Sequence, residues 1–274
     1  MAFRTGVIQL NSGADRQKNL TDAALLMQQA VERGAQMLVL PENFSFQGQS
    51  EADKRHHAET LEDSPSLDFL RDFSSQQGVW IVGGSIPLVA DDAHLVTNSC
   101  FVVDNQGAIQ GRYDKIHLFD VNLGGRPFRE SSVIQPGNQV VVVDTPWGKL
   151  GLTICYDLRF PELFRALVDA GAQMIAVPAA FTLNTGRDHW ELLLRARAVE
   201  NLAWVFASDQ WGKHPGGRST YGHSMVVEPW GTVVGRCSDG VGITVVDVDL
   251  GVCEVSRKKI PCLDHRVGFL SGKQ

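Results

Sequence analysis

A short pattern occurs twice in this chain of 274 residues, at 34–42 and again at 171–179. Each copy begins Gly-Ala-Gln-Met, continues with three aliphatic residues and then reaches a proline. Glycine commonly follows the end of a helix, and a short apolar run is typical of a buried strand. Each copy therefore predicts the end of a helix followed by a strand of a parallel sheet.

The residues before each copy complete a larger unit. Apolar residues recur at helical spacing through 19–33, and 161–170 begins with a proline that suits the first turn of a helix. An apolar strand precedes each helix, at 7–10 and at 149–154. We therefore expect two strand-helix-strand units of similar design, as an internal duplication produces.

The remaining elements favour a layered α/β sandwich. We expect further strands at 79–83, 99–103, 140–143, 204–207, 225–228 and 243–248, and helices at 67–75 and 188–201, the second capped by Asp188. The strand-rich end of the sequence lacks the helices that a closed β/α barrel needs between its strands. No linker or low-complexity segment divides the sequence, so we expect a single domain over residues 1–274.

The composition excludes several classes of protein. A formal net charge of −6 argues against a surface for nucleic acid or anionic membranes. The amino terminus is too short and polar for a signal peptide, and no apolar run is long enough to span a bilayer. The five cysteines are widely spaced and form no Cys-x-x-Cys pair, so they indicate neither a disulfide framework nor a zinc ribbon, and they favour a reducing cytoplasm. We therefore expect a protein that binds or acts on small molecules.

Cys155 is the strongest candidate for a nucleophile in this sequence. It follows the apolar strand at 149–154, and Pro161 and Glu162 come after it in the pattern of a helix start. The positive end of a helix favours the thiolate, which is the nucleophilic form of cysteine. A buried cysteine that only fills space is the commoner alternative, so the assignment depends on partner groups.

A cysteine nucleophile needs a proton acceptor, and the oxyanion formed by attack on a carbonyl needs a cation or a hydrogen-bond donor. Glu42 ends a predicted strand, so its carboxylate is expected to face the same crevice as Cys155. Lys115 stands among large apolar residues, where Glu130 would pair with it and hold it charged. Surface positions for the two carboxylates, and a lysine whose stem crosses an apolar surface, are the alternatives.

Four motifs occur in a fixed order along the chain. They are Leu40-Pro41-Glu42-Asn43, Tyr113-Asp114-Lys115-Ile116-His117-Leu118-Phe119, Arg129-Glu130-Ser131 and Cys155-Tyr156-Asp157-Leu158-Arg159-Phe160-Pro161-Glu162. Together they resemble the nitrilase superfamily of carbon–nitrogen hydrolases, in its amidase branch, and the resemblance covers essentially the whole chain. It implies a four-layered αββα sandwich, association as homodimers or larger homo-oligomers, and no metal or organic cofactor.

The resemblance also implies a Glu-Lys-Cys triad. Glu42 would be the general base, Lys115 the cationic stabiliser and Cys155 the nucleophile, while Glu130 matches the second glutamate of the family. In this scheme Cys155 attacks an amide carbon, and Lys115 with the backbone N–H of Tyr156 stabilises the oxyanion. Ammonia then leaves, and water hydrolyses the thioester.

The segment after Cys155 resembles the amidase branch rather than nitrile hydrolases. The later segments 180–182, 189–198 and 221–227 look more like enzymes that act on deaminated glutathione. The expected substrate is therefore the ω-amide of an α-keto acid, deaminated glutathione above others. Other substrates remain open: α-ketoglutaramate, carbamoyl amines and aliphatic amides. A Cys-His hydrolase that uses His117 or His223 is an alternative mechanism. A non-catalytic binding protein on the same fold is the alternative of a different class.

Deaminated glutathione carries a carboxylate at each end, so its pocket should contain cationic groups. Arg159 is the expected cation, and an ion pair of Arg159 with Glu162 or Asp157 is the alternative. Three further residues are expected to line the pocket: Tyr156, Phe181 and Thr182. A role in the aromatic core is the alternative for Phe181.

Overall fold

The two predicted strand-helix-strand units form the centres of two separate β-sheets in the computed structural model, which describes residues 2–92, 94–123 and 126–267. The first unit is β1 (Ala2–Gln9), α1 (Arg16–Glu32) and β2 (Met37–Val39), and the second is β10 (Gly148–Leu152), α4 (Pro161–Asp169) and β11 (Met174–Ala179). The two strands of each unit are parallel neighbours. The predicted duplication is therefore present in the topology.

Each unit is extended by further strands of its own sheet. The first sheet has the order β17-β1-β2-β3-β5-β4, with β6 also paired to β5, and the second has the order β16-β15-β12-β11-β10-β9. The added strands are β3 (Trp80–Val82), β4 (Ile86–Val89), β5 (Val96–Val103), β6 (Ile109–Asp114), β9 (Val142–Thr145), β12 (Trp204–Asp209), β15 (Met225–Val227), β16 (Val233–Arg236) and β17 (Gly242–Asp249). Two small hairpins lie apart from these sheets: β7 (Asp120–Leu123) with β8 (Arg126–Arg129), and β13 (Trp211–Lys213) with β14 (Ser219–Tyr221).

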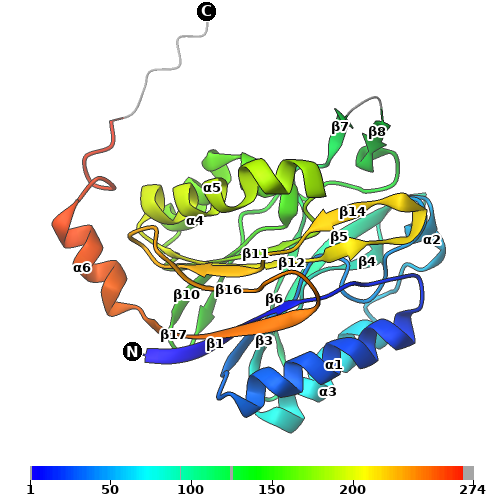
Figure 1. Ribbon diagram of the computed structural model, residues 1–274, viewed down its shortest axis with the longest axis horizontal. Helices are drawn as coiled ribbons and strands as arrows, with labels where there is room; N and C mark the ends of the chain where they lie inside the picture. Colours follow the sequence, from blue (N-terminus) through cyan, green and yellow to red (C-terminus); the bar gives the residue numbers. More distant parts are fainter. Residues whose placement is uncertain (1, 93, 124–125, 268–274) are drawn as a thin grey trace, which may run out of the picture.

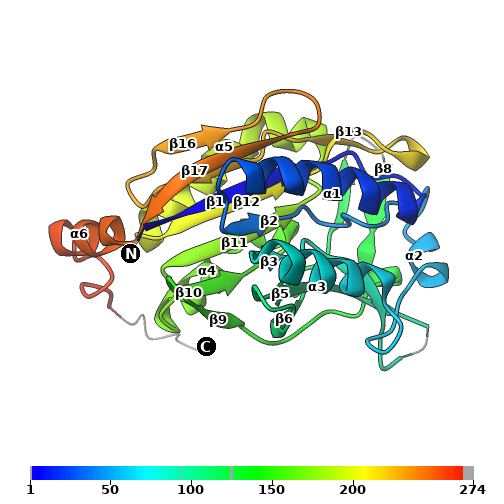
Figure 2. The same cartoon turned by 90° about the horizontal axis from the view of Figure 1, so that it is seen from below.

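Helices cover the outer face of each sheet, so the fold has four layers (Figures 1 and 2). Helices α1 and α3 (Pro65–Gln77) lie on the first sheet, and α4 and α5 (Leu183–Asn201) lie on the second. The short α2 (Asp53–His56) and the late α6 (Gly251–Lys259) lie at the edges. The predicted αββα sandwich is confirmed. Within the described ranges, no helix combines the length and the apolar character needed to cross a membrane.

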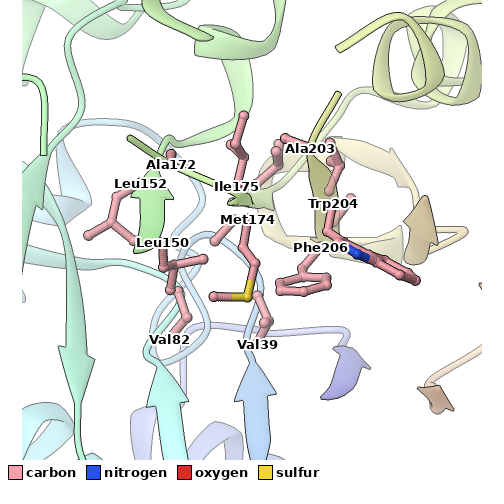
Figure 3. Packing of buried hydrophobic residues seen from close by; sticks show 14 of the residues in the cluster. Val39, Val82, Leu150, Leu152, Ala172, Met174, Ile175, Ala203, Trp204 and Phe206 are labelled. Atoms are coloured by element: carbon pink, nitrogen blue, oxygen red, sulfur yellow. The ribbon is translucent and has the colours of Figure 1, made fainter. Parts of the chain in front are cut away.

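The period-two alternation of the strands divides the core into two parts. Val39 of β2 and Val82 of β3 point toward Leu150 of β10 and Met174 of β11 (Figure 3). These side chains fill the space between the sheets. The intervening residues of the first sheet, such as Leu38, pack outward against α1 and α3. The sheets are thereby fixed relative to each other by completely buried aliphatic side chains.

Helix α5 corrects one prediction, because it begins at Leu183 after Thr182 and not at Asp188. The first turn contains Gly186, which argues against a helix on propensity alone. A Cβ at that position would overlap the side chain of Tyr221 on β14, so glycine allows the helix to pack closely on that hairpin. Tertiary packing therefore overrides the local signal. Helix α6 was also not predicted, and it follows the last strand of the segment expected to be rich in strands.

Gly84 offers a test of how the fold positions the loop that carries Glu42. Its φ is +58°, and an added Cβ would overlap the carbonyl oxygen of Pro41. We expect Gly84→Ala to lower the free energy of unfolding by about 3 kcal/mol, as judged from denaturant titration, because both strain and overlap must be relieved. Gly78→Ala is the matched control, since Gly78 has φ +68° and no atom near its Cβ position. It should cost only about 1 kcal/mol, and equal losses would contradict the proposed overlap.

Candidate active site

Four loops bring the predicted catalytic residues to one end of the two sheets. Glu42 lies three residues after the end of β2, and Cys155 lies three residues after the end of β10. Lys115 directly follows β6, and Glu130 begins a 3-10 turn after β8. All four side chains are buried, and they contact each other or line one cavity. Glu42 and Cys155 thus follow strand ends on the same side of the sheets, where open α/β sheets bind ligands.

Cys155 occupies a strained turn between β10 and α4. Its φ is +48°, a left-handed conformation that costs a non-glycine residue about 1 to 3 kcal/mol. It begins a 3-10 turn that ends at Arg159, and α4 starts at Pro161. The helix start predicted at Pro161 is therefore present, and it lies six residues beyond the thiol.

The carboxylate of Asp157 holds this turn. One oxygen accepts hydrogen bonds from the backbone N–H of Ile154 at 2.8 Å and from the hydroxyl of Tyr113 at 2.7 Å. The other oxygen contacts His117, at 3.1 Å from the backbone nitrogen and 2.7 Å from Nδ1. Asp157 is completely buried, so its carboxylate needs these hydrogen-bond donors. Through them it links the turn of Cys155 to the segment that carries Lys115.

Lys115 is the centre of the charged cluster. Its Nζ lies 2.8 Å from Oε1 of Glu42, and 3.0 and 2.9 Å from the two carboxylate oxygens of Glu130. An ammonium group has three N–H donors, and the three contacts with the two carboxylates engage all of them. The pairing of Lys115 with Glu130, proposed from the sequence, is therefore present.

Glu42 is fixed by bonds to both carboxylate oxygens. Oε1 accepts from Nδ2 of Asn98 at 2.8 Å as well as from Lys115, and Oε2 accepts from the backbone N–H of Ala180 at 3.0 Å. Burial alone would raise the pKa of Glu42, but the charge of Lys115, followed by those of Lys54 and Arg218, outweighs it and lowers that pKa to about 2. Glu42 is thus an ionised carboxylate at neutral pH, as a proton acceptor must be.

The thiol of Cys155 differs from the sequence-based expectation. We expected the helix start to favour the thiolate, whereas burial and then the negative charge of Glu42 raise the pKa of Cys155 well above its ordinary value. Lys115 opposes this shift without reversing it. The thiol is therefore protonated at rest beside an ionised carboxylate, and it needs that base in the same step in which it attacks.

A small cavity lies beside Cys155. Its volume is about 20 Å³, which is room for about one water molecule. Three of the four predicted substrate-binding residues line it: Tyr156, Phe181 and Thr182. The lining also includes groups that sequence reasoning missed: Glu51, Phe119, Phe128, Ala180, Thr185 and Arg218.

Arg159 is absent from the described lining of this cavity. Its guanidinium lies over the ring of Phe181, 5.2 Å from the centroid, and 3.3 Å from Nδ1 of His189. This position replaces the ion pair with Glu162 or Asp157 that we considered from the sequence. Arg159 therefore contacts a residue of the cavity wall, Phe181, whereas Arg218 is an arginine that lines the cavity itself.

The histidines of the Cys-His alternative do not line the cavity in the described part of the chain. His117 bonds to Asp157 and stacks on Phe160, with ring centroids 3.6 Å apart. His223 contacts the carbonyl of Tyr221 at 3.0 Å. The carboxylate of Glu42 contacts Lys115 at 2.8 Å, so the geometry favours a Glu-Lys-Cys arrangement over a Cys-His one.

The fold and this arrangement define a class of hydrolase that uses a buried cysteine with a carboxylate and a lysine on an αββα sandwich. A family model described as carbon-nitrogen hydrolase matches residues 4–258. The chain belongs to the carbon–nitrogen hydrolase family, whose members hydrolyse carbon–nitrogen bonds other than peptide bonds.

Named relatives give a finer comparison. The chain is 43% identical over 263 residues to a deaminated glutathione amidase of Yersinia enterocolitica, covering 94% of this chain and 91% of the relative. It is 40% identical over 271 residues to a deaminated glutathione amidase of Homo sapiens, covering 97% and 83%.

Solved structures have the same fold. The NitFhit protein of Caenorhabditis elegans is 38% identical with a TM-score of 0.89, and the match covers 97% of this chain but only 65% of that one. A branch 10 member of the nitrilase superfamily from Saccharomyces cerevisiae is 31% identical with a TM-score of 0.87, covering 95% and 94%. An amidase from Nesterenkonia, 28% identical with a TM-score of 0.79 and coverage of 95% and 98%, carries an acrylamide adduct on its active-site cysteine.

Removal of the charge of Glu42 tests the electrostatics of the site. In Glu42→Gln the negative charge that raises the pKa of Cys155 is gone, so the thiolate should appear at a lower pH than in the native protein. Titration of the ultraviolet thiolate absorbance, with the same titration of Cys155→Ser variants subtracted, measures this shift. A Cys155 pKa that is unchanged or higher in Glu42→Gln would contradict the arrangement.

Asp157→Asn tests how the turn is held. One carboxylate oxygen of Asp157 would become an NH₂ group, which cannot accept the hydrogen bonds that this oxygen now takes from Tyr113, His117 or Ile154. At least one of these donors would then be left without an acceptor. We expect the free energy of unfolding to fall by about 2 kcal/mol or more. Asp144→Asn, on the exposed side of β9, is the control and should be nearly neutral. Similar losses in the two variants would show that Asp157 does not anchor the turn.

Proposed function

We propose that this protein is an amidase that hydrolyses the ω-amide of deaminated glutathione through a thioester on Cys155. The observation that carries the proposal is the ionised Glu42 held by Lys115 beside a protonated buried thiol. The substrate is supported by the full-length relatives that bear the name deaminated glutathione amidase. A cationic Arg218 in the cavity lining suits a substrate that carries carboxylates.

The first half of the reaction forms the thioester. Glu42 takes the thiol proton as the sulfur of Cys155 attacks the amide carbon, and the carbonyl oxygen becomes an oxyanion. The positive charge of Lys115 and the backbone N–H of Tyr156 would stabilise this oxyanion. The tetrahedral intermediate collapses as protonated Glu42 returns its proton to the departing nitrogen.

The identity of the departing group follows from the substrate. A primary amide such as α-ketoglutaramate releases ammonia. In deaminated glutathione the amide nitrogen belongs to cysteinylglycine, so that dipeptide leaves, and the expectation of ammonia as its leaving group was wrong. The same α-ketoglutaryl group remains bonded to Cys155 as a thioester in either case.

The second half releases the acid. Water gives a proton to Glu42 as its oxygen attacks the thioester carbon, and the sulfur then leaves and takes up that proton. Glu130 remains an anchor for Lys115 in both halves, since its carboxylate also accepts from the backbone N–H of Phe119 at 2.7 Å.

A substrate panel tests this function. We expect release of α-ketoglutarate from deaminated glutathione to exceed that from α-ketoglutaramate, with nitriles and carbamoyl amines unreactive. Cys155→Ala should abolish release, and Glu42→Gln should lower kcat by at least about a hundredfold because the base is lost. An enzyme-coupled assay of α-ketoglutarate measures both substrates.

The control separates chemistry from folding. Cys100→Ala removes a buried thiol in the core between the sheets, and it should change stability but retain turnover. Activity that survives in Cys155→Ala would overturn the mechanism. A preference for carbamoyl amines or nitriles would overturn the proposed substrate.

We also propose that residues 1–274 act as one domain, as homo-oligomers in the cytoplasm. The single domain is supported by one family match over residues 4–258 and by the core shared between the sheets. Exposed apolar side chains on α5, Leu192 and Val199, support association. Free cysteines support a reducing compartment.

A further inference from the structure

A groove adjoins the cavity beside Cys155 and shares part of its wall. Glu51, Phe128 and Arg218 line both the cavity and the groove. The groove has a volume of about 220 Å³, the space of about seven water molecules, whereas the inner cavity holds about one. A substrate that extends beyond its reacting amide therefore has room in this groove, past the wall formed by Glu51, Phe128 and Arg218.

The charges of the groove favour an anionic ligand. Lys54, Arg129 and Arg218 line it, against the single acidic side chain of Glu51 among its described lining residues. Lys54 is engaged by Glu51 at 2.8 Å, and its side chain is only 5% exposed. Arg129 lies at the exposed rim. Glu51 thus neutralises part of the positive charge but not all of it.

Arg218 retains unused hydrogen-bonding capacity. One terminal nitrogen donates to the carbonyl of Ala180 at 2.8 Å, while the other lies 3.7 Å from Glu51, too far for a hydrogen bond. Its buried Nε has no hydrogen-bond partner within the described residues, and neither has the buried Oε1 of Gln47 on the same groove. A ligand with both an acceptor and an N–H donor would satisfy these two groups.

The chemistry of the reaction decides which part of the substrate lies there. The acyl part stays bonded to Cys155 until water releases it, so it cannot move outward along the groove. The amine part leaves first and needs a path outward. An amine as small as ammonia would not need a groove with the space of about seven water molecules.

We propose that this groove binds the amine part of the substrate, a peptide with a free carboxylate, and that Arg218 is the specificity-determining residue that binds this carboxylate. Glu51 stands in for the carboxylate in the free protein. Gln47 accepts from the N–H of the peptide, and Lys54 and Arg129 add positive charge. The inference rests on the proposed function, because it takes the peptide to be the leaving group of the proposed amide.

Three substrates with the same acyl group test the groove: deaminated glutathione, its derivative with a carboxamide in place of the terminal carboxylate, and α-ketoglutaramate. In the native protein, kcat/KM should be at least about tenfold higher for the acid than for its carboxamide, as expected of a charge-assisted contact. In Arg218→Gln this ratio should approach one, while α-ketoglutaramate loses much less. Arg218→Lys should restore part of the ratio.

Two further variants keep the result independent of folding around Ala180. Arg129→Gln alters only the exposed rim, and it should lower the ratio of acid to carboxamide by a smaller factor. Arg236→Gln is the matched control, because Arg236 forms an exposed ion pair with Glu191 at 3.0 Å away from the groove. It should leave the ratio unchanged.

A ratio that stays the same in Arg218→Gln, or a native protein indifferent to the carboxamide, would overturn the groove assignment while the amidase function stands. If none of the three amides is hydrolysed, the proposed function fails instead. In that case calorimetric titration with S-methylcysteinylglycine decides the groove separately. Weaker binding to Arg218→Gln than to the native protein supports the assignment, and equal or absent binding overturns it.

Discussion

The ammonium group of Lys115 between two carboxylates is the interaction on which the site depends. Removing an ion from water costs several kcal/mol even after relaxation, so a buried lysine is stable only with close partners. Glu42 and Glu130 supply them at 2.8 and 2.9 Å. Those two carboxylates come from different loops, and each takes further bonds from backbone N–H groups of Ala180 or Phe119. One cation therefore fixes the relative positions of loops that the chain delivers separately.

The duplication explains why Glu42 and Cys155 lie near each other. Glu42 follows the second strand of the first unit, and Cys155 follows the first strand of the second unit. Neither unit contains the whole site, which lies where the two sheets end together. The aliphatic core between the sheets sets this spacing, with Val39 and Val82 against Leu150 and Met174 (Figure 3). The packing of this core therefore determines the distance between the loops that carry Glu42 and Cys155.

Local signals predicted the parts of the site that are local. The proline after β2 and the residues that follow Cys155 gave Glu42 and Cys155 their places at strand ends. Arg218 was missed because its approach depends on the turn at 215–217 packing against residue 49, where Gly216 allows close contact. Helix polarity alone also misjudged the thiol of Cys155. Its pKa is governed by burial and by Glu42, which is distant in sequence.

The charge balance suits a thiol that is activated only when it reacts. Before attack, Glu42 is ionised and Cys155 is protonated. Transfer of the proton between them gives a neutral acid and a thiolate, so the net charge around Lys115 is unchanged. The buried cluster need not gain or lose a charge, which would be costly at low dielectric. A resting thiolate is not required, and the protonated form is less open to alkylation and oxidation by other electrophiles.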